Sequence, residues 1–331
     1  SNDLTFKERL DPRVISSLGE EEVVFTNYNV EQIKKILEER INEAFVEDTV
    51  EESALNLCAA LAGGEHGDAR RAIDLLRVAG EIAERQQSDK VTTKNVEQAK
   101  QKIEENKIID FLTSLSKKGE SVDEIFGAVK SIKKKAKIIK GFKNSFDTCG
   151  TGGDGSKTFN ISTTVAIICS SCNVCIAKHG NKAVSSLSGS ADVMTELGVK
   201  IDIDQDTIKK CLKEIGLCFL FAPNFHPILK NVAEIRKSIG KRTIFNILGP
   251  LLNPVESNMQ LIGVYDKDLK LKVAEVLKQT GSKKAWVVSG FDGLDELTIT
   301  DKNYIVELDN GKIHENVFVF DKNGIKITYK L

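Results

Sequence analysis

The residues with the clearest chemical potential form a glycine-rich segment, Gly150-Thr151-Gly152-Gly153-Asp154-Gly155. It lies between a predicted strand, Phe146–Cys149, and a predicted helix, Ile161–Ser171. The spacing of its glycines fits a dinucleotide-binding fingerprint and also approaches a nucleotide phosphate loop, although Ser156 stands where the latter needs a lysine. A third interpretation is a pyrophosphate-binding loop of another kind, because loop N–H groups and a helix N-terminus attract anions.

The residues after the second predicted strand discriminate between these interpretations. A dinucleotide site places Asp or Glu there to hold a ribose diol. Here the strand Val174–Ala177 is followed by Lys178-His179-Gly180-Asn181. A cation at this position favours a phosphate group over a bare diol, so the sequence predicts a site for a phosphorylated ligand.

The elements that must position these residues follow from hydrophobic periodicity. We expect residues 1–105 to be helical beyond the first stretch, with Asp68 and Thr93 as N-caps. Two amphipathic helices should follow, Ile108–Lys117 and Val122–Ala136, the second capped by Ser121. The expected helices of the front segment are Val30–Ala44, Val50–Leu61, Asp68–Gln86 and Thr93–Glu104.

From Ser145 onward, short apolar strands alternate with helices, which is α/β order. A β-hairpin, Tyr304–Leu308 and Ile313–Phe320, should turn at Asp309-Asn310-Gly311. The sequence therefore predicts a helical segment (1–105), a helical pair (106–144) and an α/β domain (145–331). The expected strands before the hairpin are Phe146–Cys149, Val174–Ala177, Val199–Ile201, Cys218–Phe221, Leu261–Val264 and Ala285–Ser289.

Composition narrows the class of protein. The formal net charge of the 331 residues is −1, which implies no general attraction to nucleic acid or membrane. We see neither a signal peptide nor an apolar run long enough to span a bilayer. Seven cysteines without a disulfide-like framework indicate a reducing cytoplasm. Cys169, Cys172 and Cys175 imitate metal spacing, but we expect them to be small core residues.

Arginine is unevenly distributed along the chain. Residues 1–107 contain seven arginines, whereas the remaining 224 residues contain two, Arg236 and Arg242, beside thirty lysines. Surface solvation does not require such a change, because either residue serves there. The shift indicates two segments of different origin, joined near Lys107–Ile108.

From about Ile108 to Val319, the sequence resembles anthranilate phosphoribosyltransferases. The resemblance implies the α/β fold of the nucleoside phosphorylase and phosphoribosyltransferase type. It also implies transfer of a phosphoribosyl group from phosphoribosyl pyrophosphate to anthranilate in tryptophan biosynthesis, a homodimer and Mg²⁺. The motifs that carry it are 150–155, 158–163, 178–181, 184–192, 242–254 and 292–296.

The same resemblance implies a role for individual residues. Ser162, Asp295 and Glu296 would hold Mg²⁺, and Gly150, Asn181 and Arg236 would contact anthranilate. The donor would be bound by Gly150, Gly153, Asp154, Thr158, Asn160, Ile161, Ser162, Thr163, Lys178, Ser186 and Ser190.

The expected chemistry is displacement at the anomeric carbon of the ribose. Orientation and stabilisation of the leaving pyrophosphate should dominate. We assign no general base, because an aromatic amine needs little help to lose its proton after attack. His179 is expected to shape the substrate site.

The front segment, about residues 1–105, resembles the lid of archaeal AAA+ replication initiators. By that resemblance Asn2 would be a sensor, Arg13 an arginine finger and Arg70 a second sensor. No phosphate loop or acidic magnesium motif accompanies them, so we expect no ATPase activity. Two alternatives to the transferase remain open: an inactive fusion of two partial domains, and a nucleic-acid-binding module, which the net charge disfavours.

Overall fold

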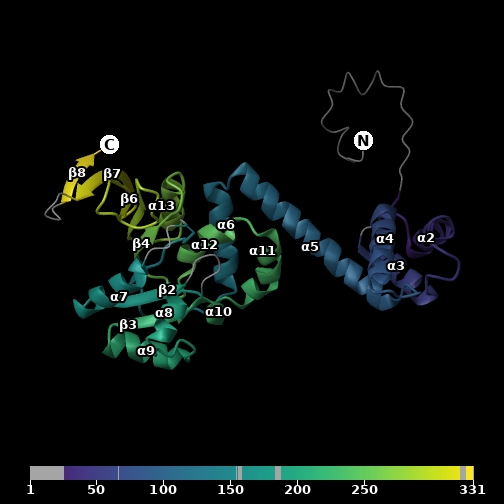
Figure 1. Cartoon of the computed structure of the whole chain (residues 1–331), viewed down its shortest axis with the longest axis horizontal. Coiled ribbons are helices and arrows are strands. Elements are labelled where there is room, and N and C mark those ends of the chain that lie inside the picture. The colour runs from purple at the N-terminus through teal and green to yellow at the C-terminus, as the bar shows by residue number, and fades with distance from the viewer. Residues whose placement is uncertain are drawn as a thin grey trace, which may run out of the picture. The chain divides into compact units, whose positions relative to one another are not determined.

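The structure is a computed structural model that describes residues 26–65, 67–153, 155, 159–182, 188–320 and 326–330. The chain divides between Asn106 and Lys107 into two compact units, called here the helical unit and the α/β unit (Figure 1). Among the described residues, no helix combines the length and the apolarity needed to cross a membrane.

The helical unit packs its helices around a core of its own. Asn29 and Gln32 form a capping box at the start of α2, and the Asp68 side chain accepts the Arg70 N–H at the start of α4, which confirms the predicted cap. The core is formed mainly by small and aliphatic side chains such as Leu37 and Leu76. The helices are α2 (Val30–Ala44), α3 (Glu52–Glu65), α4 (Ala69–Arg85) and the first part of α5 (Thr93–Lys118), which belongs to the α/β unit from Lys107 onward.

Helix α5 corrects two predictions. The cap lies one residue earlier than expected, because Thr93 is already helical and the Thr92 N–H donates to Asn95 Oδ1 at 2.9 Å. The expected helices Thr93–Glu104 and Ile108–Lys117 are one continuous helix. Residues 105–107 contain neither glycine nor proline, so nothing there interrupts the helical hydrogen bonds.

The α/β unit is built on one eight-stranded sheet in the order β3-β2-β1-β4-β5-β6-β7-β8 (Figure 1). The first five strands in that order are parallel, and β5 to β8 pair antiparallel. The strands are β1 (Phe146–Thr148), β2 (Ile176–Gly180), β3 (Leu217–Phe221), β4 (Met259–Gly263), β5 (Lys284–Gly290), β6 (Asn303–Asp309), β7 (Lys312–Phe320) and β8 (Lys326–Lys330).

The strand order locates the binding crevice. The chain proceeds outward from β1 to β2 and β3, then returns to the other side of β1 with β4. Ligands of open α/β sheets bind outside the carboxyl ends of the strands where the order reverses. In this sheet that point lies between β1 and β4, and the glycine loop directly follows β1.

Helices cover the sheet and carry its core. The largest core cluster joins α6 to the middle of the sheet through residues such as Ile125, Ile262 and Val287. Ser121 and Glu124 form the capping box that starts α6, as predicted for Ser121. The remaining helical elements are α6 (Val122–Lys134), α7 (Ile161–Ser171), α8 (Ser190–Glu196), α9 (Gln205–Glu214), α10 (Ala222–Phe225), η2 (Pro227–Val232), α11 (Ala233–Ile239), α12 (Phe245–Leu248), η3 (Gly249–Leu252) and α13 (Leu269–Gln279).

The segment Val199–Ile201 is not the predicted strand. The Val199 N–H donates to the Met194 carbonyl at 2.9 Å, beside Gly198 with a φ of 78°. These apolar residues therefore belong to the C-terminal cap of α8 rather than to the sheet. The predicted hairpin turn is confirmed, since Asn310 and Gly311 both have positive φ between β6 and β7.

The prediction for the three cysteines holds only in part. Cys169 and Cys175 are half-buried, whereas Cys172 is exposed. Within the described ranges, no group of three or more His, Cys, Asp or Glu side chains is placed to hold a metal ion.

The core of the α/β unit can be tested at Ile262, which is fully buried in β4. Ile262→Ala should lower the free energy of unfolding by about 3 kcal/mol, because it removes buried methylene groups and leaves a cavity. Ile299→Ala is the matched control, since Ile299 is 80% exposed, and should change stability by less than about 0.5 kcal/mol. Trp286, the single tryptophan and part of β5, reports unfolding of this unit by fluorescence in urea. Equal losses in the two variants would contradict the packing described here.

Candidate active site

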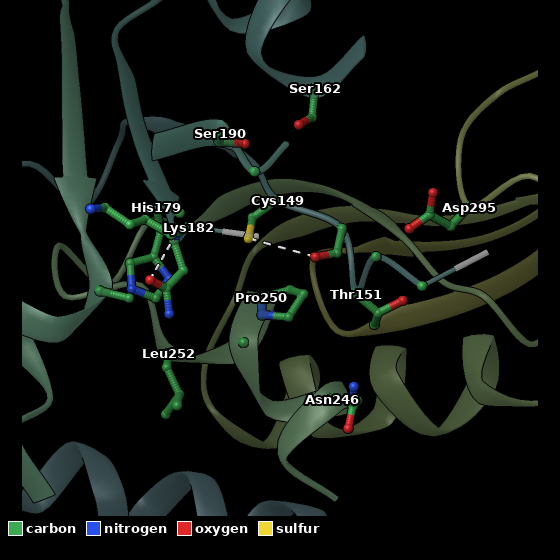
Figure 2. A pocket seen from close by; sticks show the side chains of 18 of the residues that line it. Cys149, Thr151, Ser162, His179, Lys182, Ser190, Asn246, Pro250, Leu252 and Asp295 are labelled. Atoms are coloured by element: carbon green, nitrogen blue, oxygen red, sulfur yellow. Dashed lines mark hydrogen bonds between the residues drawn. The ribbon is translucent and has the colours of Figure 1, made fainter. Parts of the chain in front are cut away.

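A cavity of about 350 Å³ opens at the carboxyl ends of β1 and β2 and includes the loop after β1, which lies where the strand order predicts a crevice (Figure 2). Its walls come from the glycine loop, the start of α7, the end of β2, α11, α12 and the loop after β5. The predicted site residues that line it are Gly150, Gly153, Asn160, Ile161, Ser162, Lys178, Asn181, Ser190, Arg236, Asp295 and Glu296.

Four predicted donor residues do not join this lining. Asp154, Thr158 and Ser186 lie outside the described residues. Thr163 lies beneath the surface of the cavity, 1% exposed, and its hydroxyl has no hydrogen-bond partner among the described residues. The structure therefore places Thr163 behind the wall that Asn160 and Ser162 form.

Two close backbone approaches bring the acidic loop to the glycine loop. Gly263 ends β4, and a Cβ there would overlap the backbone oxygen of Asp295. A Cβ on Gly150 would lie 3.4 Å from Asp295 Oδ2. Glycine at both positions thus lets a carboxylate reach the first residue of the loop that follows β1. Figure 2 shows His179 at the left of the drawn pocket and Asp295 at its right.

The floor of the site holds a fully buried ammonium group. Lys178 is 0% exposed, and its Nζ donates to the Thr148 carbonyl at 2.6 Å and to Ser162 Oγ at 3.1 Å. Burial lowers the pKa of Lys178, while neighbouring acidic groups oppose that shift. The contacts fix the end of β1 and the start of α7 to β2.

Asp147 lies beside this lysine in β1 and is also fully buried. Its carboxylate accepts the His179 N–H at 3.0 Å and Asn253 Nδ2 at 2.7 Å. Burial raises the pKa of Asp147 to about 6, against the opposing effects of Lys178 and these hydrogen bonds. The carboxylate ties β1 to β2 and to the residue that follows η3.

Two histidines in contact, His179 and His226, form part of the cavity wall. The rings of His179 and His226 meet edge to face with centroids 5.4 Å apart. Burial lowers the pKa of His179 to about 3, so its ring is neutral at physiological pH. Sequence reasoning missed His226, whose only signal was its position after β3 in Phe225-His226-Pro227.

Arg236 projects from α11 into the same cavity. Its guanidinium lies 5.1 Å from the centroid of the Phe245 ring, and burial lowers its pKa. Cys149 also lines the cavity, but burial raises the pKa of its thiol to about 12. The thiol therefore stays protonated, which argues against a nucleophilic role.

Comparison with known proteins identifies the family. The sequence profile of the a/b domain of the glycosyl transferase family matches residues 143–329, more than half of the chain. The chain belongs to the glycosyl transferase family. The profile of the Cdc6 AAA+ ATPase-type lid domain matches residues 34–101, which confirms the predicted lid-like segment.

Relatives of this chain include the anthranilate phosphoribosyltransferase of Thermoanaerobacter sp. (strain X514). It is 51% identical over 220 residues, which cover 66% of this chain and 64% of the relative. The crystal structure of the anthranilate phosphoribosyltransferase from Thermus thermophilus matches with a TM-score of 0.62 and 35% identity, over 67% of this chain and 66% of that one.

A third similar protein is the Saccharomyces cerevisiae anthranilate phosphoribosyltransferase in complex with PRPP and Mg. It matches with a TM-score of 0.59 and 31% identity, over 76% of this chain and 65% of that one. These comparisons confirm the expected fold class. The chain spans just under two thirds of the length of these relatives.

The titration of Asp147 gives a pH test of the buried hydrogen-bond network around Asp147 and Lys178. The folded-state pKa of about 6 lies above the value of about 3.9 expected for an unfolded chain. Between these values the folded state holds a proton that the unfolded chain has lost, so stability falls as the pH rises. Relative to Asp147→Asn, the parent should lose about 3 kcal/mol of unfolding free energy between about pH 4 and pH 6.

The measurement is urea unfolding followed by Trp286 fluorescence at several pH values. Asp301→Asn, which alters an exposed carboxylate, is the control and should follow the parent across the range. A parent and an Asp147→Asn variant that change in parallel would show that Asp147 does not titrate in this window.

Proposed function

We propose that this glycosyl transferase moves a phosphoribosyl group from phosphoribosyl pyrophosphate to anthranilate, with Mg²⁺ as the cofactor. The observation that carries the proposal is one cavity that joins an anion-binding loop, a buried lysine, a carboxylate pair and an arginine. The names of the similar proteins support the same substrates.

The donor half of the cavity suits a pyrophosphate. The glycine loop after β1 and the N-terminus of α7 line this half, where a helix N-terminus presents positive partial charge, and the Lys178 side chain lies below them. Because these donors are fixed before the ligand arrives, they stabilise the leaving group without reorganisation.

The residues present also fit the implied metal. Asp295 and Glu296 line the cavity together with Ser162, and Asp295 Oδ2 lies close to Gly150. Two carboxylates and a hydroxyl do not form a complete cage, which is the usual case for Mg²⁺ that also binds substrate phosphates and water. When bound, Mg²⁺ would neutralise charge on the departing pyrophosphate.

The acceptor half suits a small aromatic acid. Arg236 offers a planar pair of donors to a carboxylate, and the neutral rings of His179 and His226 supply an uncharged wall. Asn181 lines the cavity near the end of β2. These residues would orient the aromatic amine toward the anomeric carbon, and no side chain need act as a general base.

The proposal is tested by incubating the chain with phosphoribosyl pyrophosphate, Mg²⁺ and anthranilate, and following the loss of anthranilate fluorescence. Donor-dependent loss is expected. Calorimetry with Mg²⁺ and pyrophosphate, using Gly153→Val as a loop-blocked control, separates the alternatives. Binding without turnover would support the inactive fusion, whereas absence of both would remove the proposed function.

Arg236→Lys tests the acceptor site. The substitution keeps the charge but loses the planar fork, so the Michaelis constant for anthranilate should rise about tenfold, equivalent to about 1.4 kcal/mol. The constant for the donor should barely change. Lys237→Met removes a cation of the same helix that does not line the cavity, and should behave like the parent. An unchanged anthranilate constant in Arg236→Lys would exclude this arginine as the clamp.

Asp295→Asn combined with Glu296→Gln tests the metal site. It removes two charges with little change in volume, so turnover should slow and half-saturation should need more Mg²⁺. Affinity for anthranilate should change little. Asp301→Asn supplies the control for loss of a nearby exposed carboxylate. An unchanged Mg²⁺ titration in the double variant would remove these residues from the metal site.

A further inference from the structure

Arg242 contacts the glycine loop from outside the cavity. Gly153 lines the cavity, whereas Arg242 does not belong to the lining. The guanidinium donates from Nη2 to the Gly153 carbonyl. That carbonyl therefore faces away from the cavity, toward the arginine.

Tyr265 holds the other side of this contact. The Arg242 guanidinium lies 3.8 Å from the centroid of the Tyr265 ring, a cation–π distance. The Tyr265 N–H also donates to Thr151 Oγ1 at 3.2 Å. The Thr151 N–H in turn donates to the Gly263 carbonyl at 2.8 Å. The segment after β4 thus fixes the loop at Thr151 directly and at Gly153 through the stacked arginine.

Hydrogen bonds also fix the backbone around Arg242. Ser116 Oγ in α5 donates to the Arg242 carbonyl at 3.0 Å. The next residue, Thr243, donates its N–H to Asn246 Oδ1 at 3.0 Å. The guanidinium therefore projects from a fixed point, although the residue is exposed to solvent.

We propose that Arg242 is a positioning residue for the donor-binding loop; this rests on the proposed function. A carbonyl that faced the pyrophosphate would repel it, and the charge-assisted bond to Arg242 keeps the Gly153 carbonyl outside. Arginine suits this task better than lysine because its planar group can stack on a ring and donate at its edge.

The two arginines of the α/β unit would then have different roles. Arg236 lines the cavity from α11, and Arg242 follows the end of that helix at Gly240, whose φ is 60°. Within this short segment, Arg236 reaches the acceptor side of the cavity and Arg242 contacts the donor-binding loop. Loss of Arg242 should consequently affect the donor alone.

The test is calorimetric titration of the full chain with Mg²⁺ and pyrophosphate, alongside steady-state kinetics. Arg242→Met should weaken pyrophosphate binding at least about fivefold and raise the donor Michaelis constant similarly. Arg242→Lys should lose nearly as much, and the anthranilate constant should not change in either variant. Lys241→Met removes one exposed charge at the neighbouring position and should stay within about twofold of the parent.

A second pair of variants guards against a folding defect at Arg242. Tyr265→Leu keeps the charge but removes the stacked ring, and should weaken pyrophosphate binding, whereas Tyr265→Phe should not. Parent-like binding by Arg242→Met or by Tyr265→Leu would overturn the positioning role alone. If Lys241→Met weakened pyrophosphate binding equally, the effect of Arg242 would be one of general charge, and the positioning role would be overturned too. Absence of pyrophosphate binding by the parent would remove the proposed function and this role together.

Discussion

The burial of one ammonium group governs the architecture of the site. A charge removed from water is costly unless hydrogen bonds and opposite charge compensate it. The Lys178 ammonium donates hydrogen bonds to the Thr148 carbonyl and the Ser162 hydroxyl, and Asp147 supplies negative charge nearby. These contacts fix the ends of β1 and β2 and the start of α7 against one another. The glycine loop connects β1 to α7, so both of its ends are held in place.

The same network explains why the sequence could predict part of the residue set that lines the cavity. The glycine loop follows β1 and Lys178 lies in β2, the next strand of one βαβ arrangement, so their proximity follows from local order along the chain. The resemblance to transferases added Asp295 and Arg236, which composition could not place. Their meeting in one cavity depends on the pairing of β1 with β4 and on two glycines that admit Asp295, and neither feature is visible in periodicity.

Where the predictions failed, local signals were ambiguous. Val199–Ile201 has the composition of a short strand, but its backbone hydrogen bonds belong to the end of α8. The hydrophobic pattern changes near residue 107 and so predicts two helices, although nothing there breaks the backbone of the continuous α5. His226 was missed because its edge-to-face contact with His179 is a tertiary contact with no sequence spacing of its own.

The pairing of β1 with β4 also bears on the order of events during folding. Phe146 and Met259 are register partners although more than one hundred residues separate them along the chain. Parallel pairing over such a separation costs the entropy of closing a long loop. The turn at Asn310 and Gly311 closes a very short loop, so the hairpin pays little of this entropic cost. The antiparallel half of the sheet can therefore assemble early from neighbouring segments. The crevice, which exists only once β1 lies beside β4, belongs to the late stage of folding, so a full-length chain that refolds would form a native-like hairpin before it could bind any ligand.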